Sequence, residues 1–324
     1  MSKTVLHPPT LDEISAAARR IAPYVLRTPL VPLGVDGGPA RIFLKPENLQ
    51  PIGSFKLRPA ASALAAVEGD RLEQEGVLTV SSGNMAQGVA WMARRLGVAA
   101  RVVAARGQVA ANKKAALERL GADLREVPFE DFWRLIVDHR LPGLAGYFVH
   151  PVANQDVVAG DATVGLEILE DLPDVDTIVV PHGGGGLVSG IASAVKARGS
   201  KARVLSCECS LATPVAAALA AGHPVDIAPM KSWIAGISVG PVLADMWPLI
   251  SALVDGAVAA SPQEIAEAVA LLMRHNRLLA EGAGAASVAA AMAGRAGGGT
   301  VVCVISGGNI DKHHLTAVLQ GRTP

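Results

Sequence analysis

The segment that decides the fold is Thr177–Leu187, which reads TIVVPHGGGGL. An apolar run of strand length leads into four consecutive glycines, and a stretch with helical spacing begins at Leu187. Backbone N–H groups can converge in such a loop and the helix behind it favours an anion, so the segment predicts a phosphate site. A flexible turn is the alternative, although four successive glycines carry a high entropy cost. The common nucleotide loops do not fit, because no Gly-Lys-Ser/Thr follows and Val188 and Ser189 break the G-x-G-x-x-G spacing.

Outward from this segment, apolar runs of strand length alternate with stretches of helical spacing along almost the whole chain. This alternation predicts an α/β protein with mostly parallel sheets covered by helices on both faces. Two capping-box patterns, at Thr10 and Ser261, predict helices that run to about Tyr24 and Asn276. The other expected elements are strands at 41–45, 77–81, 99–104, 123–127, 177–181, 203–207 and 300–305, and helices at 84–96, 111–120, 130–140, 155–170, 187–198 and 282–293.

The stretch from residue 76 to residue 153 contains three of the expected strands and three of the expected helices, and His150-Pro151 lies near its end. We interpret this stretch as a smaller domain inserted in a larger one. The predicted division is a discontinuous large domain, 1–75 plus 154–324, which contains the phosphate-binding glycine loop, and a small domain, 76–153.

The composition argues against several classes of protein. The 324-residue chain is half hydrophobic, and its 29 basic residues balance 29 acidic residues without a long run of either sign. This balance gives no support to a nucleic-acid surface or a polybasic membrane anchor. No apolar run is long enough to cross a bilayer, and the N-terminal residues contain no signal-peptide core. We therefore expect a soluble, cytoplasmic protein.

The three cysteines, Cys207, Cys209 and Cys303, lack a companion cluster of Cys or His. We expect them to pack as small hydrophobic side chains rather than to bind zinc.

Lys56 is the candidate nucleophile, within the segment Gly53–Arg58 that reads GSFKLR. An amine held at a strand-to-helix junction beside an apolar ring is partly desolvated, and desolvation favours the neutral, nucleophilic form. Together with a phosphate-binding glycine loop, this lysine indicates a cofactor that carries both an aldehyde and a phosphate, which is pyridoxal phosphate.

Two further motifs stand where strands end. The segment Ser81–Gly88, SSGNMAQG, offers hydroxyls, an amide and helix N-terminal N–H groups that could bind a carboxylate or a phenolic oxygen. A helix cap is an equally good interpretation of this segment. In VISGGN, Ser306 stands at the carboxyl end of a buried strand, where open α/β sheets bind ligands. Its hydroxyl could hydrogen-bond a pyridine nitrogen, or cap the next helix.

The lysine, serine and glycine motifs, in this order and spacing, resemble those of the fold-type II pyridoxal-phosphate enzymes. The branch is that of the serine/threonine dehydratases, or threonine ammonia-lyases, and the serine racemases. Residues 43–50 with 53–56 resemble the family's lysine segment, and 160–168 resembles the stretch before its glycine loop. The resemblance implies two open, twisted, mostly parallel α/β domains with the cofactor between them, and a homodimer.

The resemblance also implies roles for individual residues. Lys56 would form the Schiff base and transfer the α-proton, and Ser82 would be the second base of a racemase. Phe55 would lie against the cofactor ring, Asn84 would meet its hydroxyl and Ser306 its nitrogen. The other residues at the cofactor would be Gly183, Gly184, Gly185, Gly186 and Leu187 at the phosphate, with Gly236 and Glu281 at the flank, and the substrate would contact Ser81, Ser82, Gly83, Asn84 and Met85.

The activity that these roles imply is elimination from a β-hydroxy-L-amino acid, which yields a 2-oxo acid and ammonia. A neutral pyridine beside Ser306 stabilises a carbanion less than a pyridinium would, which favours rapid loss of the β-hydroxyl. Threonine or serine is the expected substrate, with a bulkier analogue such as phenylserine next. An amino-acid racemase of the same fold is the first alternative, and a non-catalytic α/β anion-binding protein is the second.

The chain departs from the family's pattern at several positions. Met85 replaces a histidine and Pro59 stands where glycine is common, so the preferred substrate side chain can differ from that of serine and threonine. Glu208 and Ala212 are weak candidates for a divalent-cation site, and Pro214 cannot be a side-chain ligand, so no metal is expected. The chain also ends soon after Ser306, so we expect no regulatory domain.

Overall fold

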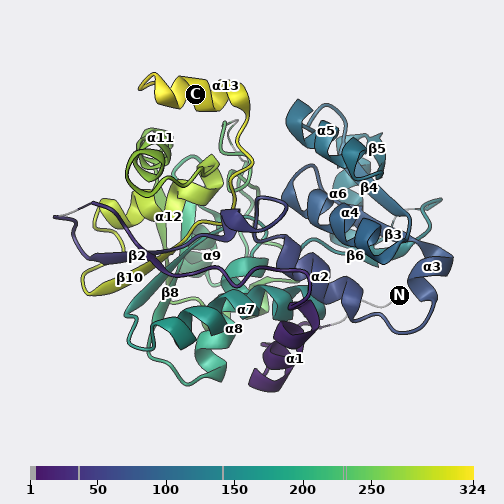
Figure 1. Ribbon diagram of the computed structural model, residues 1–324, viewed down its shortest axis with the longest axis horizontal. Helices are drawn as coiled ribbons and strands as arrows, with labels where there is room; N and C mark the ends of the chain where they lie inside the picture. The colour runs from purple at the N-terminus through teal and green to yellow at the C-terminus, as the bar shows by residue number, and fades with distance from the viewer. Residues whose placement is uncertain (1–4, 36, 141, 229, 231) are drawn as a thin grey trace.

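The strands of the protein form two separate sheets (Figure 1). The computed structural model describes residues 5–35, 37–140, 142–228, 230 and 232–324. The larger sheet has the order β1-β2-β10-β7-β8-β9, and the smaller has the order β5-β4-β3-β6. Every pairing is parallel except that of β1 with β2. The strands are β1 Val31–Pro32, β2 Arg41–Lys45, β3 Val77–Val80, β4 Ala100–Ala105, β5 Asp123–Val127, β6 Tyr147–Val149, β7 Thr177–Pro181, β8 Arg203–Cys209, β9 Gly256–Ala260 and β10 Thr300–Val304.

Helices cover both faces of the larger sheet, as expected for parallel strands that read as continuous apolar runs. One core cluster joins this sheet to α11, α12 and α13, and a second joins its other face to α7, α8, α9 and α10. The bounds are α7 Gln155–Asp171, α8 Gly186–Ala197, α9 Pro214–Ala221, α10 Trp247–Leu253, α11 Pro262–Leu271, α12 Gly282–Met292 and α13 Lys312–Leu319, with α1 Leu11–Ile21 packed outside α7 and a π-helical turn at Leu272–Asn276 after α11. Figure 1 shows α11 and α12 on the side opposite α7 and α8.

The smaller sheet lies at the other end of the molecule (Figure 1). Its strands all fall between Val77 and Val149, inside the range predicted for the inserted domain, while the domain division itself stays a prediction. One core cluster joins α2, α4 and α5 to this sheet, and another joins α6 to its opposite face. The bounds are α2 Leu57–Ala65, α3 Arg71–Glu75, α4 Asn84–Leu96, α5 Ala111–Arg119 and α6 Phe129–Asp138, with a short 3-10 helix at Glu47–Leu49.

Both predicted capping boxes form. The hydroxyl of Thr10 accepts a hydrogen bond from the N–H of Glu13, whose carboxylate accepts one from the N–H of Thr10, and Ser261 and Glu264 repeat the arrangement. The helix after Thr10 ends at Ile21, earlier than predicted. Strands β1, β6 and β9 were not predicted, because β1 and β6 are only two and three residues long and β9 is mainly Ala and Gly.

The three cysteines are free and buried, and burial raises the pKa of Cys207 and Cys303, so packing is their role as predicted. In the described part of the chain, no helix is both long and apolar enough to cross a membrane.

Candidate active site

The lysine segment lies against the end of β10. The backbone N–H of Phe55 donates a 3.0 Å hydrogen bond to the carbonyl of Ser306, and Gly308 donates one of 2.8 Å to Gly53. An isolated β-bridge between Ser54 and Gly307 completes this pairing. The chain turns into α2 directly after Lys56, so the structure brings the candidate lysine and the candidate serine together at the carboxyl edge of the larger sheet.

The Lys56 amine is held in a partly apolar position. Its Nζ atom donates a 2.8 Å hydrogen bond to the carbonyl oxygen of Pro151 and lies 5.0 Å from the centre of the Phe55 ring. Burial lowers the pKa of the Lys56 amine below its ordinary value, and the nearby carboxyl group of Asp161 acts in the opposite direction. The lysine is thus placed to lose its proton more readily than a surface lysine, as the sequence predicts.

Helix α4 approaches the lysine closely through a glycine. A Cβ atom on Gly88 would lie 2.6 Å from the carbonyl oxygen of Lys56, which is too close for any side chain. The predicted Ser81–Gly88 motif therefore also has a packing function, because Gly88 lets α4 lie against the start of α2.

The glycine loop joins β7 to α8 and has no room for side chains. A Cβ atom would lie 2.6 Å from the carbonyl oxygen of Gly236 if placed on Gly183, and 2.7 Å from Oδ2 of Asp161 if placed on Gly186. Gly185 has a φ of 94°, in the region that favours glycine. Among the described residues, no acceptor hydrogen-bonds the N–H groups of Gly184, Gly185 or Gly186. These groups stand at the N-terminus of α8, as an anion site requires.

His182 precedes the glycine loop and is buried. Burial lowers the pKa of His182 to about 4, so its imidazole is neutral near pH 7. The anion-binding character of the loop therefore comes from backbone N–H groups and the helix N-terminus rather than from a histidine charge.

The serine loop between β3 and α4 presents one unused hydroxyl. Ser82 Oγ is buried and has no hydrogen-bond partner within the described part of the chain, whereas Ser81 Oγ accepts a hydrogen bond from the N–H of Gly83. The side chain of Met85 is 2% exposed and packs in the core with α2 and α4. The Met85 side chain therefore belongs to this core cluster, and its contact with a substrate stays a prediction.

Asn84 links the serine loop to the larger sheet. Its Nδ2 donates a 2.6 Å hydrogen bond to Glu281 Oε1, and its Oδ1 accepts one of 2.9 Å from Asn309. A Cβ atom on Gly307 would lie 2.4 Å from Glu281 Oε1, so these groups surround the residue that follows Ser306. Gly236 contacts the glycine loop, as noted above, and also faces Ala283 on α12, 2.8 Å from its own Cβ position. The structure thus links Asn84 and Glu281 to the residue after Ser306, and Gly236 to the glycine loop, while their roles at a cofactor stay predictions.

Pyridoxal phosphate fits these residues. The glycine cradle and its unbonded N–H groups suit a phosphate, and Lys56 suits an aldehyde. The buried hydroxyl of Ser306 and the amide of Asn84 are hydrogen-bonding groups that suit a substituted pyridine ring.

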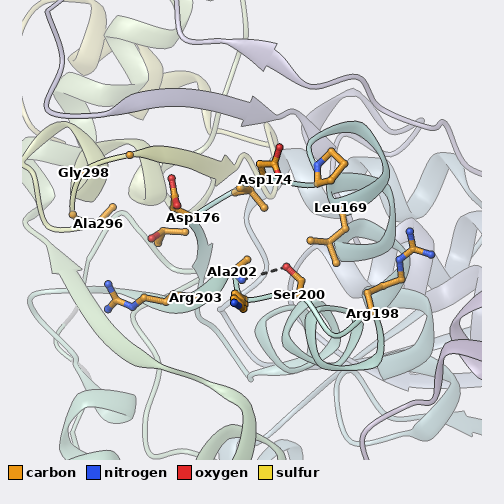
Figure 2. A pocket seen from close by; sticks show the side chains of 15 residues that line it. Leu169, Asp174, Asp176, Arg198, Ser200, Ala202, Arg203, Ala296 and Gly298 are labelled. Carbon is orange, nitrogen blue, oxygen red and sulfur yellow. Dashed lines mark hydrogen bonds between the residues drawn. The ribbon is translucent and has the colours of Figure 1, made fainter.

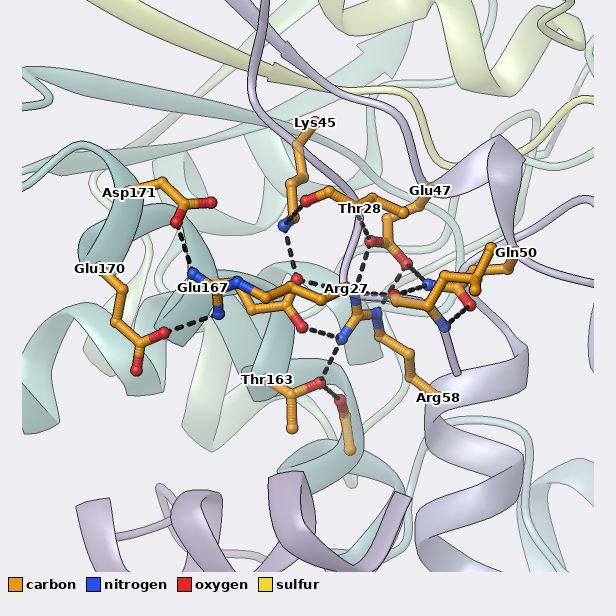
Figure 3. A network of polar contacts seen from close by, with 12 residues as sticks. Arg27, Thr28, Lys45, Glu47, Gln50, Arg58, Thr163, Glu167, Glu170 and Asp171 are labelled. Carbon is orange, nitrogen blue, oxygen red and sulfur yellow. Dashed lines mark hydrogen bonds and ion pairs between the residues drawn. The ribbon is translucent and has the colours of Figure 1, made fainter. Parts of the chain in front are cut away.

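The sequence did not reveal the polar network around Arg58, two residues after Lys56 (Figure 3). Arg58 is fully buried on α2 and donates hydrogen bonds of 2.7 and 2.8 Å to the two oxygens of Glu47, and of 2.7 and 2.9 Å to those of Glu167. Lys45 donates one of 2.5 Å to Glu167. The network ties the helix that begins after Lys56 to β2 and α7. A buried arginine was the missed signal, since charged residues are rarely fully buried unless they are paired.

Within this network the charges stabilise one another. Burial alone would raise the pKa of Glu47, but the charge and hydrogen bonds of Arg58 outweigh burial, so the pKa of Glu47 is lowered. Likewise burial would lower the pKa of Arg58, and the two glutamates raise it. Arg58 and Glu47 are therefore a buried pair in which each charge stabilises the other.

The weak metal candidates have other roles. Glu208 accepts hydrogen bonds of 2.6 and 3.1 Å from the N–H groups of Val215 and Ala216, at the start of α9, and Ala212 is buried beside β8. Among the described residues, no group of three or more His, Cys, Asp or Glu side chains could hold a metal ion.

None of the candidate site residues lines the depression of about 770 Å³ that Figure 2 shows. It is lined by Asp176, Thr177, Arg203 and Gly299, where β7, β8 and β10 begin. Open α/β sheets bind ligands at the opposite, carboxyl edge, where Lys56 and the glycine loop lie.

Comparison with known proteins agrees with this geometry. A family model described as "Pyridoxal-phosphate dependent enzyme" matches residues 21–307. The chain is 36% identical to the L-threonine ammonia-lyase of Thermotoga maritima, over 96% of this chain and 78% of that protein. It is 34% identical to a putative threonine dehydratase of Sinorhizobium fredii, over 96% of each.

Two solved structures are similar over nearly their whole length. Maize serine racemase aligns with a TM-score of 0.85 and 29% identity, over 97% of this chain and 98% of that chain. A threonine deaminase from the organism abbreviated T.th. aligns with a TM-score of 0.84 and 35% identity, over 94% of this chain and 99% of that chain.

The chain therefore belongs to the family of pyridoxal-phosphate-dependent enzymes and has the fold-type II architecture. Within that family it is an ammonia-lyase of the serine/threonine dehydratase type. The expected fold, cofactor and enzyme class are confirmed, and the non-catalytic alternative is set aside.

Proposed function

We propose that this enzyme dehydrates and deaminates a β-hydroxy-L-amino acid, threonine or serine first and a bulkier analogue such as phenylserine next. The observation that carries the proposal is the position of Lys56. Its amine is desolvated, lies over Phe55 and borders the strand end that bears Ser306. The names of the relatives, which include threonine ammonia-lyase and threonine dehydratase, support the choice of substrate.

The residues of this site would divide the work as follows. Bound pyridoxal phosphate supplies an aldehyde that an amine can attack and a ring that withdraws electrons from the substrate's α-carbon. The glycine loop would hold the phosphate, and Ser306 would meet the ring nitrogen. The backbone N–H groups of the Ser81–Met85 loop would bind the substrate carboxylate at the start of α4. Lys56 would take the α-proton, since its amine has a lowered pKa.

A substrate panel tests this proposal. We expect the purified holoenzyme to release 2-oxo acid from L-threonine, L-serine or L-phenylserine, and Lys56→Ala to abolish both this release and the visible absorbance of the bound cofactor. Lys114→Ala is the matched control, because Lys114 is half-exposed and pairs with Glu126 at 3.5 Å. Full activity of Lys56→Ala would refute the role of Lys56.

Racemisation is the second candidate function, and Ser82 is the observation that favours it. Its buried Oγ has no partner among the described residues, so it is free to exchange a proton with a ligand. Chiral analysis of the remaining amino acid would separate the two functions. A net yield of D-isomer above that of 2-oxo acid would reverse our preference, and Ser82→Ala should then lose racemisation while it keeps elimination.

A further inference from the structure

Asp161 lies next to the glycine loop and is fully buried on α7. Its Oδ2 is 2.7 Å from the position that a Cβ on Gly186 would take, and its own Cβ is 2.7 Å from the corresponding position on Gly190. The close packing of α7 and α8 thus aims the carboxyl group at the first residue of α8. This is the helix whose N-terminus the phosphate would occupy.

Neither carboxyl oxygen of Asp161 has a hydrogen-bond partner within the described residues. The charged groups that act on it from the surrounding elements are Lys56, Glu47 and Arg58. Glu47 and Arg58 already bind each other, and Lys56 donates its hydrogen bond to Pro151 rather than to Asp161. A buried polar group without a partner is costly, so this carboxyl group points to something that the protein chain itself does not supply.

We propose that Asp161 is a positioning residue that carries a proton whenever the cofactor's phosphate is bound, so that its carboxyl group places no negative charge next to the phosphate. The inference rests on the proposed placement of the phosphate at Gly183–Gly186.

The charges of the two groups explain why the proton is needed. A phosphate ester has its second pKa near 6 and is close to a dianion above pH 7. A carboxylate beside it in a buried site would repel it, whereas a carboxylic acid is neutral and can donate a hydrogen bond. Burial raises the pKa of Asp161 from an ordinary value of 3.8 to about 7, and a phosphate dianion would raise it further.

The same proton affects Lys56. The Asp161 carboxylate is the group that opposes the lowering of the Lys56 pKa by burial. When Asp161 takes up a proton, this opposition ends, and the Lys56 amine is neutral over a wider range of pH. Phosphate binding at one end of the site therefore favours the nucleophilic form of the amine at the other. The proton on Asp161 comes from solvent, and any proton that the Lys56 ammonium loses is released to solvent with either form of the ligand.

Two ligands separate this effect from the titration of Lys56. Pyridoxal phosphate and pyridoxal both react with the lysine through the same aldehyde, but only the first carries a phosphate. In the wild-type protein we compare the dissociation constant of pyridoxal phosphate with that of pyridoxal. We expect the first divided by the second to rise by up to about tenfold per pH unit between pH 7 and 9, because only the complex with the phosphate takes up a proton at Asp161. In Asp161→Asn the ratio should not change over this range.

Asp156→Asn is the matched control, since Asp156 lies on the same helix but pairs with Arg20 at 2.9 Å. It should behave like the wild type. A ratio with the same pH dependence in the wild type and Asp161→Asn would overturn the inference. Should Asp161→Asn not fold, calorimetry of the wild type in buffers of different ionisation heat counts the protons directly. Equal proton counts for the two ligands at pH 8 would also overturn it.

These measurements involve no substrate. A protein that shows the expected ratio but releases no 2-oxo acid would refute the proposed function and leave the role of Asp161 intact. An active ammonia-lyase whose ratio of dissociation constants does not change with pH would support the proposed function and refute the role of Asp161.

Discussion

Helix α7 contributes to two sets of buried charged groups, the Arg58 network and Asp161, which differ in how well they are paired. In the Arg58 network, Glu47 and Glu167 each accept two hydrogen bonds from the guanidinium, and Lys45 donates a third hydrogen bond to Glu167 (Figure 3). Asp161 is on the same helix as Glu167, yet neither of its oxygens has a hydrogen bond from the described residues.

This difference in pairing distinguishes residues that hold the fold from residues that can bind a ligand or a proton. A fully paired network has nothing left to bind and serves to hold α2 and Lys56 in place. An unpaired buried group has its bonding capacity still available, and such groups concentrate where a ligand or proton is handled. Both sets lie near Lys56, one holding its helix and the other affecting its charge.

The largest effect is expected from Arg58→Met, which breaks the paired set. It leaves Glu47 buried without its cationic partner, and removing one member of a buried ion pair typically costs about 3–5 kcal/mol. Urea denaturation followed by circular dichroism should show this loss in the free energy of unfolding.

Arg27→Met is the control for that change. Arg27 also binds two carboxylates of α7, Glu170 and Asp171, but its side chain is 50% exposed. We expect a loss of about 0–1 kcal/mol, as for surface ion pairs. Equal losses in the two variants would show that burial does not distinguish the networks.

Much of this architecture is predictable from the sequence because it depends on local signals. The apolar runs that deliver Ser306 and the glycine loop are continuous, and the capping boxes need only residues three positions apart. The motifs around Lys56 then identify the family, and the homodimer and the residue roles stay predictions from that resemblance.

The unpredicted features depend on packing between distant segments. Arg58 reads as a surface residue until Glu47 and Glu167, from two other elements, are placed around it. The side chain of Met85 is directed by the register of α4, which buries it, and a motif alone does not set that register. The unpaired state of Asp161 follows from the distance between α7 and α8, which the sequence does not specify.

The second prediction concerns how the unpaired carboxyl group of Asp161 makes the stability of the protein depend on pH. The pKa of Asp161 is about 7 in the folded protein and near 3.8 when unfolded, so between about pH 4 and 7 the folded state holds a proton that the unfolded state has lost. Stability then falls as the pH rises through this window, by up to about 1.4 kcal/mol per pH unit, and the penalty is constant above it.

Asp161→Asn removes this penalty. The free energy of unfolding of the variant relative to the wild type should therefore increase from pH 4 to pH 7 and then level off, in the cofactor-free protein. Urea denaturation at intervals of half a pH unit measures it. Two curves that stay parallel across the window would mean that Asp161 has an ordinary pKa.

The third prediction tests the contact between Asp161 and the glycine loop. In Gly186→Ala the new methyl group would meet Asp161 Oδ2 at 2.7 Å, and overpacking of this kind typically costs about 1–3 kcal/mol. Asp161→Ala removes the obstructing oxygen, so the cost of Gly186→Ala should be smaller in that background. A double-mutant cycle on unfolding free energies measures the coupling, and simple additivity would contradict the geometry.

The smallest change in unfolding free energy is expected at two serines on α8. One of their hydroxyls has a hydrogen-bond partner and the other has none among the described residues, so they compare a paired with an unpaired group that carries no charge. Ser193 Oγ donates a 2.7 Å hydrogen bond to the carbonyl of Ser189, while Ser189 Oγ is buried and has no partner among the described residues. Both Ser→Ala changes gain the same helix propensity, so the difference between them isolates the hydrogen bond. We expect Ser193→Ala to be less stable than Ser189→Ala by about 0.5–1.5 kcal/mol, measured by urea denaturation at pH 7. If Ser189→Ala were the less stable variant, its hydroxyl would have a partner in solution, and the absence of a partner could not by itself mark a site for a ligand.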